Sequence, residues 1–169
     1  MKRFGSLFVI FLTTWTLAAH DPNRGHAEAT VNGKKISISY GRPELKGRDM
    51  LAKLQPGMEW RMGMDAATSL STETDLVLGD ANIPAGTYSL IAKFNGPKDW
   101  NLIVSSDSNV RGTDRDASKD VAFIPLSVSQ LNSSVEKFLI TLEPNGTDSG
   151  ELSIAWGTMG LSTDFRVKR

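Results

Sequence analysis

The chain has 169 residues, with 19 lysines and arginines, 19 aspartates and glutamates, two histidines and no cysteine. The lack of cysteine excludes a disulfide framework, a thiolate metal site and a cysteine nucleophile. The balanced charge gives no basis for binding nucleic acid or an acidic membrane surface, so nucleic acid is not an expected partner.

The first 19 residues have the pattern of a secretory signal peptide. Lys2 and Arg3 precede an apolar run that is too short to span a bilayer stably and ends at Ala18 and Ala19. The sequence therefore predicts an exported protein, periplasmic or extracellular, with no integral membrane segment once the leader is removed. Residues 20–169 have a usual size for one domain, and the sequence predicts a single β-sandwich domain there.

Beyond the leader, short apolar segments alternate with period two and are separated by turn residues. The Asn32-Gly33 pair, between residues 27–31 and 34–40, predicts a tight hairpin. Further strands are expected at residues 67–71, 75–78, 87–94, 100–104, 121–128, 135–142, 151–156 and 161–167. This pattern predicts an all-β fold, an antiparallel β-sandwich of the jelly-roll or barrel-like kind.

Three segments depart from the strand pattern. Residues 48–55 have their apolar side chains on one side of a helix and are followed by Pro56-Gly57, so they are a candidate for a short helix, and at most one short helix is expected. Residues 127–135 are a second, weaker helix candidate. Residues 105–119 are polar and predict a long loop.

Four cations and two aromatic residues are close together in the sequence. They are Arg42, Lys46, Arg48 and Arg61, beside Tyr40 and Trp60. If they converge, the guanidinium groups can bind a carboxylate or phosphate, and the rings can stack on a sugar or a base.

A second interpretation of these arginines is structural. They would form ion pairs with nearby carboxylates and fix a long crossover loop to the sandwich, as is more common in proteins. The expected carboxylates are Glu44, Asp49, Glu59 and Asp65.

No metal ion or other cofactor is expected. His20 and His26 are the only imidazoles, and an amino-terminal copper site built on them would have no further histidine. A calcium site in the polar loop is also considered, but the spacing of its acids, Asp107, Asp114, Asp116 and Asp120, matches no known calcium loop.

Several motifs together resemble the bacterial domain-of-unknown-function family 2911. They are Gly41-Arg42-Pro43, Lys46-Gly47-Arg48, Trp60-Arg61 with Gly63 and Thr68, the run from Ile83 to Leu90, Trp100 to Ile103, and Glu151 to Trp156. The resemblance covers nearly all of the chain beyond the leader and implies an exported β-rich domain with no known activity. Members usually carry Trp-Gly and Tyr after the Trp100 segment, where this chain has residues 110–114 without an aromatic side chain.

These features favour a non-catalytic binding module of the bacterial envelope that takes a small ligand or an envelope protein. The candidate binding residues are Tyr40, Arg42, Lys46, Arg48, Trp60, Arg61 and Thr68. One alternative is a small hydrolase with Glu59 or Asp65 as its first candidate carboxylates. Another is a structural envelope protein that pairs through a sheet edge.

Overall fold

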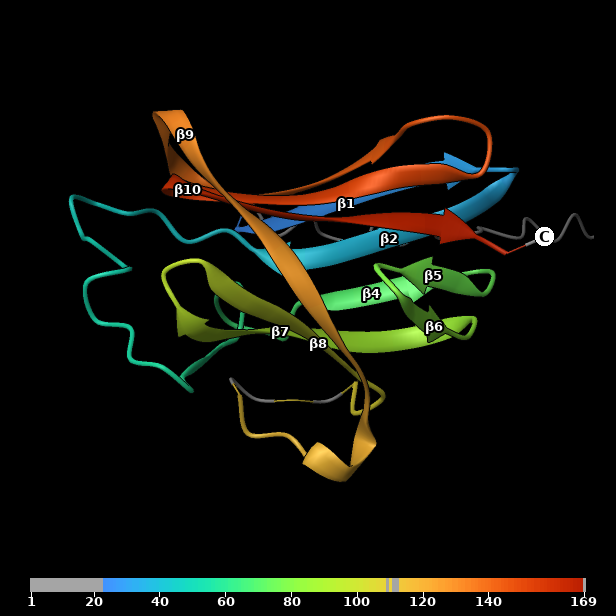
Figure 1. The fold of residues 1–169 in the computed structure, drawn as a ribbon, viewed down its shortest axis with the longest axis horizontal. Helices are drawn as coiled ribbons and strands as arrows, with labels where there is room; N and C mark the ends of the chain where they lie inside the picture. Colours follow the sequence, from blue (N-terminus) through green and yellow to red (C-terminus); the bar gives the residue numbers. More distant parts are fainter. Residues whose placement is uncertain (1–22, 109, 111–112, 169) are drawn as a thin grey trace, which may run out of the picture.

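The computed structural model describes residues 23–108, 110 and 113–168, so the expected leader and His20 lie outside the described residues (Figure 1). Nearly all regular structure is β-strand, in the order β1 (Arg24–Val31), β2 (Lys34–Gly41), β3 (Glu59–Trp60), β4 (Ser69–Thr72), β5 (Leu76–Leu78), β6 (Ala81–Ile83), β7 (Gly86–Gly96), β8 (Asp99–Ser105), β9 (Asp120–Pro144) and β10 (Ser149–Val167). One 3₁₀ turn, Ala117–Lys119, precedes β9. The predicted all-β fold is confirmed.

The strands pair in the order β1-β2-β4-β7-β8-β9-β10-β5-β6, with β3 added beside β7. Every pair is antiparallel, and the sheet does not close into a barrel. The predicted first hairpin is confirmed, because Asn32 and Gly33 both have positive φ values, 50° and 70°, between the paired strands β1 and β2.

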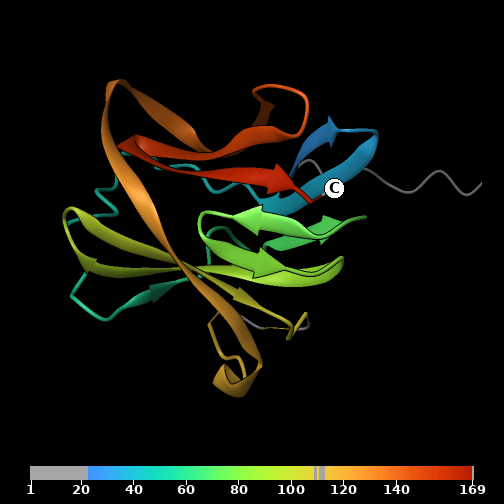
Figure 2. The same cartoon turned by 45° about the vertical axis from the view of Figure 1, so that its right-hand side comes forward.

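The long strand β9 joins the two layers of the sandwich. Its first part, through Leu126, pairs with β8, and its remainder pairs with β10. Figures 1 and 2 show β9 crossing obliquely from the layer of β7 and β8 to the layer of β10. The sequence predicted two strands here, because the polar residues of the middle of β9 interrupt the apolar alternation.

The suggested helix at residues 127–135 is wrong, because these residues belong to β9. The register with β10 shifts there: Gly157 pairs with Val135, whereas Met159 pairs with Gln130. Residues 131–134 therefore bulge away from the ladder opposite Thr158, the residue after the positive-φ glycine Gly157. The two strands predicted at 151–156 and 161–167 are likewise parts of one continuous strand, β10.

Residues 48–55, the other helix candidate, consist of bends and turns, which agrees with the expectation of at most one short helix. The Asp49 carboxylate accepts hydrogen bonds from the backbone N–H groups of Leu51 and Ala52, at 2.9 and 3.1 Å. Bonds of this kind begin helices as well as turns, so what is missing here is the hydrogen-bonded helix after them. Only one turn bond, from Leu54 N to Leu51 O at 3.1 Å, follows in this segment.

The core lies between the layers and is built from the inward side chains of the alternating strands. Ile36, Ile38 and Tyr40 of β2 are all buried, as the alternation predicts. Trp156 of β10 is also buried, with 6% of its surface exposed. Aromatic residues from different strands meet in this core, and their contacts shape the site described next.

Candidate functional site

Residues 42–68 leave the end of β2 and return to β4, and we call this segment the strap. In Figure 1 it extends beyond the strand ends, on the side where β2 ends. Backbone hydrogen bonds attach its start to the edge of β9, from Phe138 N to Pro43 O at 3.0 Å and from Leu45 N to Glu136 O at 2.9 Å. Its later part includes β3, which pairs with β7. The strap thus touches both layers.

A close backbone approach brings the two ends of the strap together. A Cβ atom on Gly41 would collide with the backbone of Met64, so only glycine permits this packing. Thr68 is buried and its hydroxyl donates to Met62 O at 2.5 Å, which holds the returning chain in place. As a result, Arg42 and Arg61 reach the same region although they are far apart in sequence.

These two arginines, with Lys46 and Arg48, line a hollow of about 470 Å³ that we call the arginine hollow. Trp60 and Trp156 form its aromatic wall, and Glu44 and Met50 also line it. Five of the seven candidate binding residues therefore meet around one space.

The other two candidates, Tyr40 and Thr68, do not line this hollow. Tyr40 is buried, and its hydroxyl donates to Ile140 O at 3.1 Å. Its ring meets Phe138 edge to face, with centroids 5.6 Å apart. Tyr40 and Thr68 are therefore buried residues that stabilise the fold.

The arginines do not form the structural ion pairs that the second interpretation expected. Glu59 instead pairs with Arg115, and Glu44 approaches Lys46 and Lys137 at 3.8 and 3.6 Å. The Asp49 carboxylate caps its own turn, as described above. In the described part of the chain, no carboxylate pairs with an arginine of the hollow.

The arginines differ in how many of their side-chain donors already have an acceptor in the protein. Arg48 donates to Leu45 O and Glu44 O, at 2.9 and 2.7 Å, and so braces the strap. Arg42 makes one long contact, from Nε to Phe138 O at 3.5 Å. Within residues 23–108, 110 and 113–168, Arg61 has no hydrogen-bond or ion-pair partner. The side chains of these two half-buried residues, Arg42 and Arg61, therefore keep donors for an anion.

The tryptophans of the wall are held rigidly. Trp60 stacks on Trp156, with centroids 5.6 Å apart and planes 8° apart. Phe138 meets both rings edge to face, at 5.2 and 5.7 Å. Because Trp60 belongs to β3 and Trp156 to β10, the stack also links the two layers.

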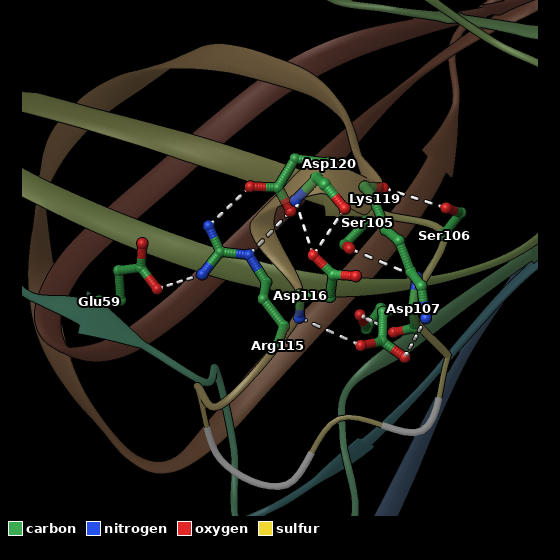
Figure 3. A network of polar contacts seen from close by, with 10 residues as sticks. Glu59, Ser105, Ser106, Asp107, Arg115, Asp116, Lys119 and Asp120 are labelled. Atoms are coloured by element: carbon green, nitrogen blue, oxygen red, sulfur yellow. Dashed lines mark hydrogen bonds and ion pairs between the residues drawn. The ribbon is translucent and has the colours of Figure 1, made fainter.

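A second polar cluster lies in the loop between β8 and β9 and was not found by sequence reasoning (Figure 3). Arg115 donates two hydrogen bonds to Asp120, at 2.8 and 2.7 Å, and a third to Glu59. The side chains of Arg115 and Asp120 are 6% and 3% exposed. The hydrogen bonds with Asp120 are the main reason that the pKa of Arg115 is raised. This arginine fixes the loop to β3 and β9.

Two acidic residues of this loop, Asp107 and Asp116, accept hydrogen bonds from the protein. Asp116 accepts from the hydroxyl and the backbone N–H of Ser118, and these bonds lower its pKa. Asp107 accepts from Asp116 N at 3.2 Å. Within the described ranges, no three or more histidines and acids are grouped so that they could hold a metal ion.

The two carboxylates considered for hydrolysis have different surroundings. Glu59 forms an ion pair with Arg115. Asp65 is an exposed residue of the strap with a φ of 61°. Neither of them lines the arginine hollow. The geometry of the hollow therefore supports anion binding and gives no support to acid catalysis by this pair.

The fold and this site define an antiparallel all-β protein with a hollow of cations and tryptophans. The chain belongs to the family described as "Protein of unknown function (DUF2911)", whose model matches residues 22–165. This confirms the family predicted from the sequence motifs. No curated protein and no solved structure matches the chain. In the part of the chain that the structure describes, no helix is long and apolar enough to cross a membrane.

Proposed function

We propose that this protein is a non-catalytic binding module that takes a small carboxylate- or phosphate-bearing ligand in the arginine hollow. The observation that carries the proposal is the pair of guanidinium groups, Arg42 and Arg61, which lie beside a tryptophan wall and have no carboxylate partner among the described residues. Guanidinium donors that have no ionic partner in the protein can form strong, charge-assisted hydrogen bonds with a carboxylate or phosphate. An anionic ligand would supply the missing partner.

Arginine is suited to this task because its planar fork matches the two oxygens of a carboxylate or phosphate. Lys46 is exposed and adds positive charge at the rim of the hollow, whereas Arg48 braces the strap. Glu44 also lines the hollow, and its approach to Lys46 and Lys137 reduces the repulsion that it would exert on an anion. The net character of the hollow is cationic.

Isothermal titration calorimetry with citrate and inorganic phosphate tests the proposal. We expect saturable binding that weakens as salt is added, and Arg61→Gln should weaken it by about 10- to 100-fold, because a hydrogen bond to a charged group contributes about 1.5–3 kcal/mol.

The matched control is Arg166→Gln. Arg166 is exposed on β10, pairs with Val77 of β5 and lines neither the arginine hollow nor its neighbours, so this substitution should leave citrate binding unchanged. Absence of binding, or equal losses in the two variants, would contradict the proposal.

We also propose that the protein is exported to the periplasm or beyond, in a bacterial envelope, and that residues 20–169 form its mature, single-domain part. The support is the basic and apolar leader of residues 1–19. Amino-terminal sequencing of protein recovered from an exporting cell should give a start near His20. Recovery of the intact amino terminus in the cytoplasmic fraction alone would refute export.

A further inference from the structure

A small apolar space adjoins the arginine hollow, and we call it the apolar slot. It has a volume of about 40 Å³ and is lined by methionine, leucine and tryptophan residues. Three of them, Met50, Trp60 and Trp156, also line the arginine hollow, so the two spaces share a wall. Cations on one side of this wall and apolar side chains on the other suit an anion that carries a hydrocarbon group.

The volume of the slot favours a chain over a ring. A cavity of about 150 Å³ holds benzene, whereas one water needs about 10–15 Å³. The slot of about 40 Å³ therefore has room for about three water-sized groups. This space matches the end of an unbranched hydrocarbon chain and is too small for an aromatic ring.

One side of the slot is formed by residues 47–56 of the strap, which we call the flap. The chain is anchored before the flap, where Lys46 N donates to Glu136 Oε1 at 2.8 Å, and after it, where Gly57 N donates to Phe94 O at 2.7 Å. In the described part of the chain, the hydrogen bonds of the flap itself all stay within the strap. The flap contacts the sandwich through apolar side chains, and its residues that line the slot are Met50, Leu51 and Leu54.

The flap has the features of a segment that can move. Gly47 and Gly57, at its two ends, have φ values of 72° and 92°, and a Cβ on either would meet no atom within 4 Å, so both are suited to act as hinges. Leu51 is 43% exposed although it lines the slot. The unbranched side chain of Met50 can change rotamer and so connect the slot with the arginine hollow.

We infer that the ligand is an anion with an unbranched hydrocarbon chain. Its carboxylate or phosphate binds in the arginine hollow, and its chain enters the apolar slot as Met50 moves aside. A chain of a few carbons fills the slot as it stands, and a longer one requires the flap to move outward. This inference rests on the proposed function for the anionic end and adds the class of the rest of the ligand.

A series of chain lengths at constant charge tests the inference by calorimetry. The probes are butyrate, hexanoate and octanoate, and in a second arm butyl, hexyl and octyl phosphate, so that the two headgroups are distinguished. In at least one arm we expect the affinity to rise about fourfold for each methylene that becomes buried, because burial of a CH₂ group contributes about 0.8 kcal/mol. Affinities that do not change with chain length in either arm would overturn the inference.

Tryptophan fluorescence locates the chain. Trp60, Trp100 and Trp156 all line the slot, and Trp15→Phe in the full chain leaves them as its only tryptophans. The probe is 8-bromooctanoate or 8-bromooctyl phosphate, whichever headgroup binds, with bromine as a quencher at the chain end. We expect saturable quenching, whereas 8-bromooctan-1-ol, which lacks the charge, should need concentrations at least about tenfold higher. Binding without quenching, or equal quenching by the alcohol, would contradict the inference.

A substitution in the slot separates the chain from the headgroup. Leu54 lines the slot but not the arginine hollow, so Leu54→Ser should weaken octanoate or octyl phosphate about tenfold and leave citrate unchanged. Val121→Ser is the matched control, because Val121 is 44% exposed on β9 and lines neither space. If Leu54→Ser does not fold, Leu51→Ser takes its place at an exposed residue of the slot. Equal losses for the chain-bearing probe and citrate would overturn the inference.

The outcomes distinguish this inference from the proposed function. If citrate binds through Arg61 but neither series gains affinity with chain length, the hydrocarbon inference is wrong and the anion site stands. If octanoate and octyl phosphate bind Arg61→Gln as tightly as the unchanged protein, the headgroup is not in the arginine hollow and the inference is overturned, while citrate still tests the proposed function. If no probe binds, both are overturned.

Discussion

Substitution of Arg115 by methionine is expected to lower the free energy of unfolding by about 3–5 kcal/mol, because it leaves a buried carboxylate without its partner. The Asp120 side chain is 3% exposed and receives two hydrogen bonds from Arg115. Methionine fills much of the arginine's volume but provides no donor. Urea denaturation at pH 7, followed by circular dichroism, measures the loss.

An exposed ion pair supplies the control for this prediction. Lys35 and Glu28 approach to 2.8 Å, with side chains 50% and 53% exposed, so Lys35→Met should cost less than about 1 kcal/mol. Adding Asp120→Asn to Arg115→Met should recover part of the stability, because the unpaired charge is then removed. Similar losses of unfolding free energy for Arg115→Met and Lys35→Met would contradict this prediction. They would show that the buried Arg115 ion pairs stabilise the protein no more than an exposed one.

Substitution of Phe138 by alanine is the second change with a large expected effect, again about 3–5 kcal/mol. Phe138 is fully buried and meets Tyr40, Trp60 and Trp156 edge to face. Its removal would leave a cavity bounded by three rings that are held from different strands and so cannot easily close it. The same denaturation experiment measures the effect.

The same strand offers a matched phenylalanine. Phe123 of β9 is 57% exposed, so Phe123→Ala should cost less than about 1 kcal/mol. A small loss at Phe138 would mean that the aromatic cluster can rearrange and that the tryptophan wall is not rigid. A large loss at Phe123 would show that the outward face of β9 is covered in solution.

The sequence predicted most strands because their side chains alternate between a buried and an exposed face. The hairpin at Asn32-Gly33 was predicted for the further reason that its turn requires positive φ values. The strands β3 and β6 were not predicted, since two or three residues are too few to show a period. The continuity of β9 was missed because a bulge lets polar residues remain within one strand.

The candidate site was predicted in part. The clustering of Arg42, Arg48 and Arg61 in the sequence was enough to suggest a shared location, and the structure brings them to one hollow. Two facts could not be read from the chain. Trp156, from the last strand, lines the hollow. Glu59 forms an ion pair with Arg115 and not with an arginine of the hollow. Both depend on long-range packing between layers.

The shared strand β9 has a consequence for cooperativity. Each layer pairs along a different part of this one strand, so pulling the layers apart breaks ladder hydrogen bonds on at least one side of it. The sandwich should therefore melt as one unit rather than layer by layer, and its slowest-exchanging amides should lie in both layers. Because the hollow takes Trp60 from one layer and Trp156 from the other, it exists only while that unit is intact.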